Sequence, residues 1–270
     1  MNRNWLLCQK YGDIRRLEME RLKEKTDKII RHSDTVQKQI SDFPVVDKYL
    51  KIKFPDVDIS DVLLYVTSPT VMSKYGWFDI GGCYVDAFKM MFIKNDFLTV
   101  PKVSGRFKKL MQASTAMKLD VEDVLVHEGI HAISSKMGRS LAKYTHMEEE
   151  FVYTNCIDFY RQKGMDNEQI INNNFLPFCI YDVYRSKADL KDIFAGVGFS
   201  VATMLKMEKQ AYWKFMNNNA ENLIPAIIKK AQDKARKMIE LYNQYGSSTY
   251  RSESIQEIND TDRFSAMGME

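Results

Sequence analysis

The chain has 270 residues and a formal net charge of +3, and 45% of its residues are hydrophobic. This length and apolar share allow one large or two modest globular domains and argue against disorder. The balanced charge argues against nucleic acid or an anionic membrane as a partner, because both need a concentrated basic field. No segment has the apolar length of a secretory signal core or a membrane span, so we expect a cytoplasmic protein. The oligomeric state has no signature in the sequence.

The first 45 residues favour helical structure. Between Asp13 and Ile40, apolar residues recur at mostly helical intervals among dense mixed charges, which is typical of one or two exposed helices. We therefore separate an N-terminal helical segment, residues 1–45, from a main domain, residues 46–245.

Three short runs near the start of the main domain predict strands. Val62–Thr67 is apolar and rich in β-branched residues, which indicates a buried strand. The glycine pair Gly81-Gly82 interrupts the chain, and Cys83–Val85 and Met90–Ile93 supply further strand-like material. Together these runs predict a small sheet.

Beyond Pro101 the sequence favours helices. The clearest one begins at Asp120, a good N-cap, and ends at Gly138, a good C-terminal stop. A second helix is expected from Glu148 to Arg161. By the same signals we expect a loop at 172–174 and helices at 186–194, 201–216 and 221–245. From Gly246 onward polar residues dominate, so residues 246–270 are predicted to be a flexible polar tail.

The helix that begins at Asp120 carries a metal-binding pattern. Residues 127 to 131 read His-Glu-Gly-Ile-His, and residues four apart on a helix differ by about 40° in direction and about 6 Å in height. His127 and His131 therefore lie on one face and are able to bind one ion. A catalytic zinc site uses three protein ligands and leaves the fourth position to water. Glu128 is placed to act on that water as a general base.

Three observations favour a metal site over the alternative, a surface helix with two unremarkable histidines. The flanking residues are uncharged, which predicts that the helix is buried around His127 and His131, and a buried imidazole needs a partner. Half of the four histidines in the chain fall in this one pattern. The carboxylates of Glu148–Glu150 follow at a useful distance.

These residues resemble the zincin metallopeptidases, whose active-site helix carries the same His-Glu-x-x-His pattern. Eighteen residues separate His131 from Glu150, a separation similar to that of the gluzincin branch, in which a glutamate on the following helix is the third ligand. The resemblance implies a zinc ion bound by His127, His131 and Glu150. The run from Glu150 to Thr154 also resembles the ligand helix of lethal-factor-like toxins. Thr154 takes the place of a residue that supports a histidine, where an acidic side chain is more common.

Helical geometry alone leaves the third ligand open. Successive residues of a helix point about 100° apart, so at most one or two of Glu148, Glu149 and Glu150 face the ion. Glu149 is the choice after Glu150. In the loop expected before the second helix, Tyr144 or His146 is a candidate hydrogen-bond donor to the oxyanion formed on the substrate. The alternative for each is an ordinary surface position.

The segment from Gly81 to Tyr84 resembles the edge strand that lies over the zincin cleft. An exposed strand edge offers unpaired N–H and C=O groups, which suits an extended peptide. An ordinary hairpin is the alternative interpretation of the same residues.

We therefore expect an α+β protein, mostly helical and zincin-like, with a small mixed sheet packed on the His127 helix and a helical C-terminal part. The expected function is that of a zinc peptidase whose substrate is a protein or peptide. One alternative is a zincin-fold protein without peptidase activity that acts as a binding or structural component. Another is a helical interaction protein in which the motif is accidental.

Overall fold

The computed structural model describes residues 3–75, 81–95, 105–106, 109, 120–139, 145–185, 187–198, 200 and 209–265. These residues are mostly helical with one small mixed sheet, which agrees with the predicted α+β class. The chain forms two compact units, Met1–Pro101 with Asp120–Ala132, and Lys102–Leu119 with Ile133–Glu270. Within the described ranges, no helix combines the length and the apolar character needed to cross a membrane.

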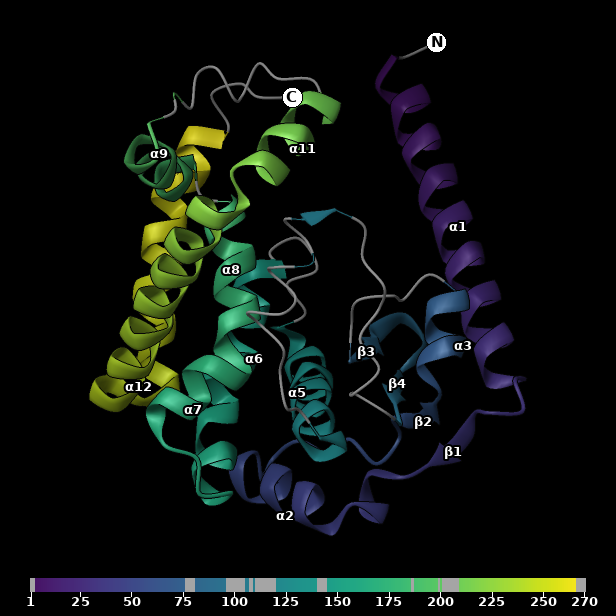
Figure 1. Cartoon of the computed structure of the whole chain (residues 1–270). Helices are drawn as coiled ribbons and strands as arrows, with labels where there is room; N and C mark the ends of the chain where they lie inside the picture. Colours follow the sequence, from purple (N-terminus) through teal and green to yellow (C-terminus); the bar gives the residue numbers. More distant parts are fainter. Residues whose placement is uncertain are drawn as a thin grey trace. The chain divides into compact units, whose positions relative to one another are not determined.

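A four-stranded sheet lies in the first unit (Figure 1). Its strands are β1 (Val36–Lys38), β2 (Leu63–Thr67), β3 (Gly82–Val85) and β4 (Met90–Lys94), arranged in the order β1-β2-β4-β3. Strands β2 and β4 run parallel, whereas β1 and β3 pair antiparallel with their neighbours. Among the described strands, β1 and β3 are therefore the two edges of the sheet.

Helices α1 (Arg3–Ile30) and α3 (Pro69–Lys74) pack on one face of this sheet. The rings of Tyr65 and Phe92 stack there with centroids 5.3 Å apart. The buried residues of this cluster are Ile29, Tyr65, Val71, Met72, Val85 and Phe92. Because burying a large apolar side chain contributes about 1.5–3 kcal/mol, this cluster is a main source of stability for the first unit.

Helix α5 (Val121–Ser134) lies against the opposite face. Side chains alternate along a strand, so Gly82 faces away from the cluster that contains Phe92. A Cβ atom built on Gly82 would lie 2.7 Å from Cγ1 of Val124 and 2.8 Å from Cγ of Glu128. The edge strand β3 therefore runs close beside α5.

Local signals at both ends of α5 agree with the prediction. The N–H of Asp123 donates to Oδ1 of Asp120 at 2.9 Å, and the N–H of Asp120 donates to Oδ2 of Asp123 at 3.0 Å. This reciprocal cap satisfies backbone groups that the first helical turn leaves unpaired. Beyond Ser134 the chain continues in a π-helical turn, η3 (Ser135–Arg139), in which Gly138 takes a left-handed φ of 67°. A glycine adopts this conformation without the steric cost that Cβ brings.

Helix α2 (Pro44–Lys53) completes the first unit beside α5. A Cβ atom on Gly129 would lie 2.7 Å from Cδ1 of Leu50, which shows how closely the two helices approach. Two short 3₁₀ helices, η1 (Ile40–Asp42) and η2 (Asp86–Phe88), connect the elements of this unit.

Helices make up the described part of the second unit. They are α6 (Thr145–Gln162), α7 (Asn167–Ile170), the π-helical turn η4 (Ile171–Phe175), α8 (Leu176–Arg185), α9 (Lys187–Gly196), α11 (Lys209–Asn218) and α12 (Ala220–Ser265). Helix α12 runs alongside α8 and also contacts α6, α9 and η4 (Figure 1). Its buried side chains recur at helical spacing and include Leu223, Ile227, Ala231, Ala235 and Ile239. This apolar stripe is the face through which α12 packs.

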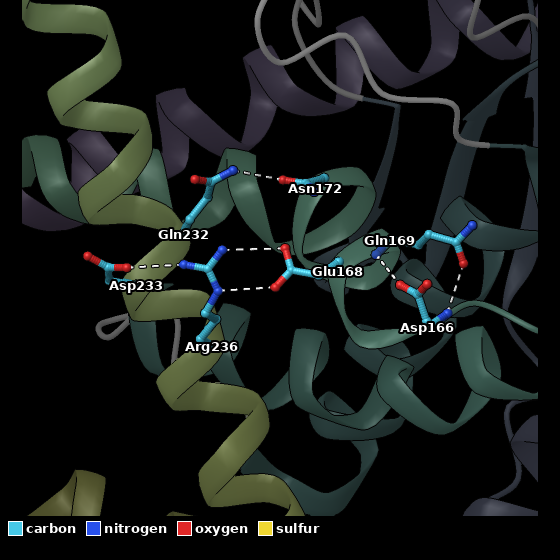
Figure 2. A network of polar contacts seen from close by, with 7 residues as sticks. All are labelled: Asp166, Glu168, Gln169, Asn172, Gln232, Asp233 and Arg236. Carbon is cyan, nitrogen blue, oxygen red and sulfur yellow. Dashed lines mark hydrogen bonds and ion pairs between the residues drawn. The ribbon is translucent and has the colours of Figure 1, made fainter.

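A polar network joins α12 to α7 and η4 (Figure 2). Arg236 donates to the Glu168 carboxylate through Nε at 3.1 Å and Nη2 at 3.4 Å, and its Nη1 lies 3.2 Å from Asp233. Gln232 donates to Oδ1 of Asn172 at 2.9 Å. The Glu168 carboxylate raises the pKa of the Arg236 guanidinium.

Three local predictions are wrong. Residues Val36–Lys38 form a strand and not the end of a helix, because they pair with β2. The second helix begins at Thr145, so His146 lies inside α6 and not in a preceding loop. The asparagine run 172–174 belongs to the π-helical turn η4 and not to a loop, and Asn174 is buried there.

The later helices are found close to their predicted positions. Residues 186–194 correspond to α9, 201–216 to α11, and 221–245 to the first part of α12; residues 201–208 lie outside the described part of the chain. Helical backbone continues beyond the non-helical Gly246 to Ser265. The flexibility of residues 246–270 stays a prediction.

Candidate metal centre

The rings of His127 and His131 lie one helical turn apart on α5. Their Nε2 atoms are 3.2 Å apart, and the ring centroids are 4.9 Å apart with the planes at 67°. Two ligands of a tetrahedral ion, each at about 2.0–2.1 Å from it, lie about 3.3 Å from one another. The two nitrogens therefore have the separation that two ligands of one such ion require.

Apolar side chains surround the two histidines, as the uncharged flanks predict. Val124, Leu125, Val126, Ile130, Ala132 and Ile133 are all buried, whereas both imidazole rings are half-buried. Partial burial of the rings strengthens their electrostatic interaction with any ion that they bind. The helix thus presents two nitrogen donors from an otherwise apolar segment.

Glu128 lies on the neighbouring side of α5, toward strand β3. Its side chain is only 6% exposed, and its Oε1 would lie 3.1 Å from a Cβ atom on Gly82. A helical residue one position after His127 points about 100° away from it, so Glu128 does not share the face of the two imidazoles. It lies beside the histidine pair and next to the edge strand.

Among the residues that the structure describes, His127, His131 and Glu149 form a candidate metal-binding group. One potential ligand atom from each residue lies within 4.8 Å of the other two. The group contains Glu149, the alternative third ligand, and does not contain Glu150, which the resemblance to gluzincins implied. Consecutive residues of α6 point about 100° apart, so a helix rotation that presents Glu149 turns Glu150 away.

The other predicted site residues fall in three different situations. Thr154 is buried, and its hydroxyl lies 2.7 Å from the Glu150 carbonyl oxygen and 3.0 Å from that of Phe151, both on its own helix. These bonds satisfy the Thr154 hydroxyl inside α6, and none to a histidine is found within the described ranges. His146 lies in the first turn of α6, but its side chain is outside the described part. Tyr144 lies outside the described residues altogether.

Sequence reasoning missed the contact between Gly82 and Glu128. The glycine pair Gly81-Gly82 was the available signal, and it indicated a break in the chain and an edge strand. Strand β3 is an edge among the described strands, and it also pairs antiparallel with the next strand β4, as the hairpin alternative expects. The structure also shows that Gly82 on this edge strand lies against Glu128.

No protein-family model, curated protein or solved structure matches this chain. The chemistry of the site therefore follows from its own residues. Two imidazole nitrogens and one carboxylate oxygen make a donor set suited to a divalent transition metal.

Proposed function

We propose that the chain is a zinc-dependent peptidase with a zincin-like active site, in which His127, His131 and Glu149 bind the ion and Glu128 is the general base. The observation that carries this proposal is the approach of the two Nε2 atoms to 3.2 Å with the Glu149 carboxylate in the same group. Two imidazoles and one carboxylate are the protein ligands of a known class of catalytic zinc sites.

The two histidines bind an ion only as neutral rings. Each presents Nε2 to the other ring, so each lone pair is available when the proton is on Nδ1. Glu149 adds the negative charge that a divalent cation needs in a partly buried place. The three side chains thereby favour a cation over a neutral or anionic ligand.

Glu128 supplies the proton transfer in this proposal. When bound, zinc supplies Lewis acidity, which makes a water molecule a nucleophile near neutral pH and polarises a carbonyl group. Glu128 takes the proton from the attacking water and delivers it to the leaving amine. Its burial and its place on the side of α5 next to His127 keep the carboxylate near the ligands without making it one of them.

The edge strand β3 supports a peptide as the substrate class. An extended peptide that pairs with a sheet edge is bound through its backbone, so peptides with many different side chains can bind in this way. Because Gly82 of β3 lies against Glu128, a chain paired with this edge would run past the general base. Small substrates without a peptide backbone would not form strand-like hydrogen bonds with such an edge.

The test combines metal analysis with an activity assay on the full chain. After extensive dialysis, the purified protein should retain about one zinc ion per chain and should cleave an unfolded protein such as casein. A chelator should abolish cleavage, and added zinc should restore it. Glu128→Gln should keep the zinc and lower kcat by about 10²–10⁴-fold, the usual contribution of general acid–base catalysis.

A matched control is Glu122→Gln, which changes a carboxylate in the first turn of the same helix. This variant should keep both zinc and activity. Absence of zinc from the wild-type protein would contradict the proposed metal site. Retained zinc without cleavage by the wild type would support the binding or structural role instead.

A further inference from the structure

Gly82 is a glycine because of the space around it and not because of its backbone conformation. It lies in β3 opposite Ile93 and is not among the glycines with positive φ. A Cβ atom at this position would lie 2.7 Å from Cγ1 of Val124, 2.8 Å from Cγ of Glu128 and 3.1 Å from its Oε1. Carbon atoms pack at about 3.5–4.0 Å, so any side chain here overlaps with two residues of α5.

The two residues that meet Gly82 have little freedom to move away. Val124 and Glu128 lie one turn apart on the same side of α5, and both are buried. Displacing either of them requires a rotamer change in a packed interior or a shift of strand β3. The space beside Gly82 is therefore the space that the Glu128 side chain occupies.

We propose that Gly82 is a positioning residue of the peptidase: the missing side chain leaves the room in which Glu128 reaches the reacting water. This inference rests on the proposed function, in which Glu128 is the general base. A general base acts only within hydrogen-bond reach of the proton that it removes, and a displacement of about 1 Å is able to lower the rate by about 10²-fold. Strand β3 thus leaves room for the base at Gly82, where a side chain would fill that room.

Gly129 provides a matched control on the same helix. A Cβ atom there would lie 2.7 Å from Cδ1 of Leu50, and the next atom, also of Leu50, lies 3.7 Å away. The overlap is similar in size to that at Gly82, but it falls on the terminal methyl group of one buried side chain of α2. Gly129→Ala therefore disturbs the packing of α5 against α2 through Leu50.

The first measurement is steady-state kinetics on the zinc-loaded chain. Gly82→Ala should lower kcat by about 30–100-fold with KM within about threefold and with unchanged zinc content. Gly129→Ala should keep kcat within about threefold of the wild type, although both variants lower the Tm by a few degrees. Equal kcat for Gly82→Ala and the wild type would overturn the proposal.

A second variant separates positioning of the base from general packing. Val124→Ala removes one of the two overlaps, so Gly82→Ala should lower the Tm less in that background. The kcat of the double variant should stay low, because the new Cβ still meets Glu128. If the kcat of the double variant instead equals that of Val124→Ala alone, Gly82→Ala acts through the packing of strand β3 and not through Glu128, which would contradict the proposal.

A third measurement needs no activity and uses the metal-free chain. Gly82→Ala should lower the Tm by about 2–6 °C in the wild type and by a smaller amount in a Glu128→Ala background, which lacks the overlapping Cγ and Oε1 but keeps Val124. The same loss in both backgrounds would contradict the contact. If the wild type cleaves no peptide, this comparison of Tm values still shows whether a side chain at position 82 meets Glu128. Failure of the proposed function and failure of this inference therefore give different results.

Discussion

His127 and His131 direct their Nε2 atoms at one another across 3.2 Å, with the ring planes at 67°. Two lone pairs at this distance repel unless a proton or a cation lies between them. A cation at this place would also be within reach of the Glu149 carboxylate of the same group. The predictions below follow from the proposal that this pair binds a cation.

Removal of either imidazole should abolish stable metal binding. Loss of a residue that only supports a ligand typically lowers metal affinity by about 10–100-fold, so His127→Ala and His131→Ala should each lower it by more than about 100-fold. Competition with a chelator of known affinity measures this. His32→Ala is the control, because His32 is not part of the candidate group and its Nδ1 accepts a hydrogen bond from the Asp34 N–H. Retention of wild-type metal affinity by both histidine variants would contradict the proposed metal site.

The third ligand is decided by a pair of neighbouring variants. Glu149→Gln should lose zinc affinity by more than about 100-fold, and Glu150→Gln should stay within about threefold of the wild type. Both changes preserve side-chain size and remove one charge from the same helical turn, so each is the control for the other. The opposite pattern would assign the ligand to Glu150, as the resemblance to gluzincins implied.

Metal binding should also stabilise the folded chain. A ligand that binds only the native state adds about 4 kcal/mol at a free concentration of a thousand times its Kd. Calorimetry should therefore show that a chelator lowers the Tm of the wild type. The same chelator should leave the Tm of His127→Ala unchanged. An equal chelator effect on both proteins would point to metal bound elsewhere.

Loss of the α5 cap should weaken the fold and leave the donor set intact. Asp120→Ala removes the oxygen that accepts from the Asp123 N–H at 2.9 Å. The free energy of unfolding should fall by about 0.5–2 kcal/mol, measured by urea denaturation. Asp120→Ser restores an acceptor and should recover most of this loss. Zinc stoichiometry should be the same in all three proteins.

Apolar burial, and not the polar network of Figure 2, should hold α12 in place. Arg236→Ala removes an exposed ion pair with Glu168, and exposed pairs contribute little, so the urea midpoint should hardly change. Ile227→Ala removes a fully buried side chain of the same helix and should cost about 2–5 kcal/mol. A larger loss of unfolding free energy for Arg236→Ala than for Ile227→Ala would contradict this ranking.

Features that depend on residues close together in the chain were accessible from the sequence. The i, i+4 spacing of His127 and His131 determines that both rings share one face of any helix that contains them. The cap at Asp120 and the stop at Gly138 likewise act within one turn, and the structure confirms both. Strands β2, β3 and β4 were recognised from local composition and turn signals.

Features that depend on distant residues were decided only in three dimensions. Three consecutive glutamates have nearly the same spacing from His131, and among the described residues the candidate metal-binding group contains Glu149. Val36–Lys38 becomes a strand because β2 is beside it, and Gly82 matters because Glu128 is beside it. Local periodicity specifies which residues share a face, but the packing of elements far apart in the chain specifies what that face meets.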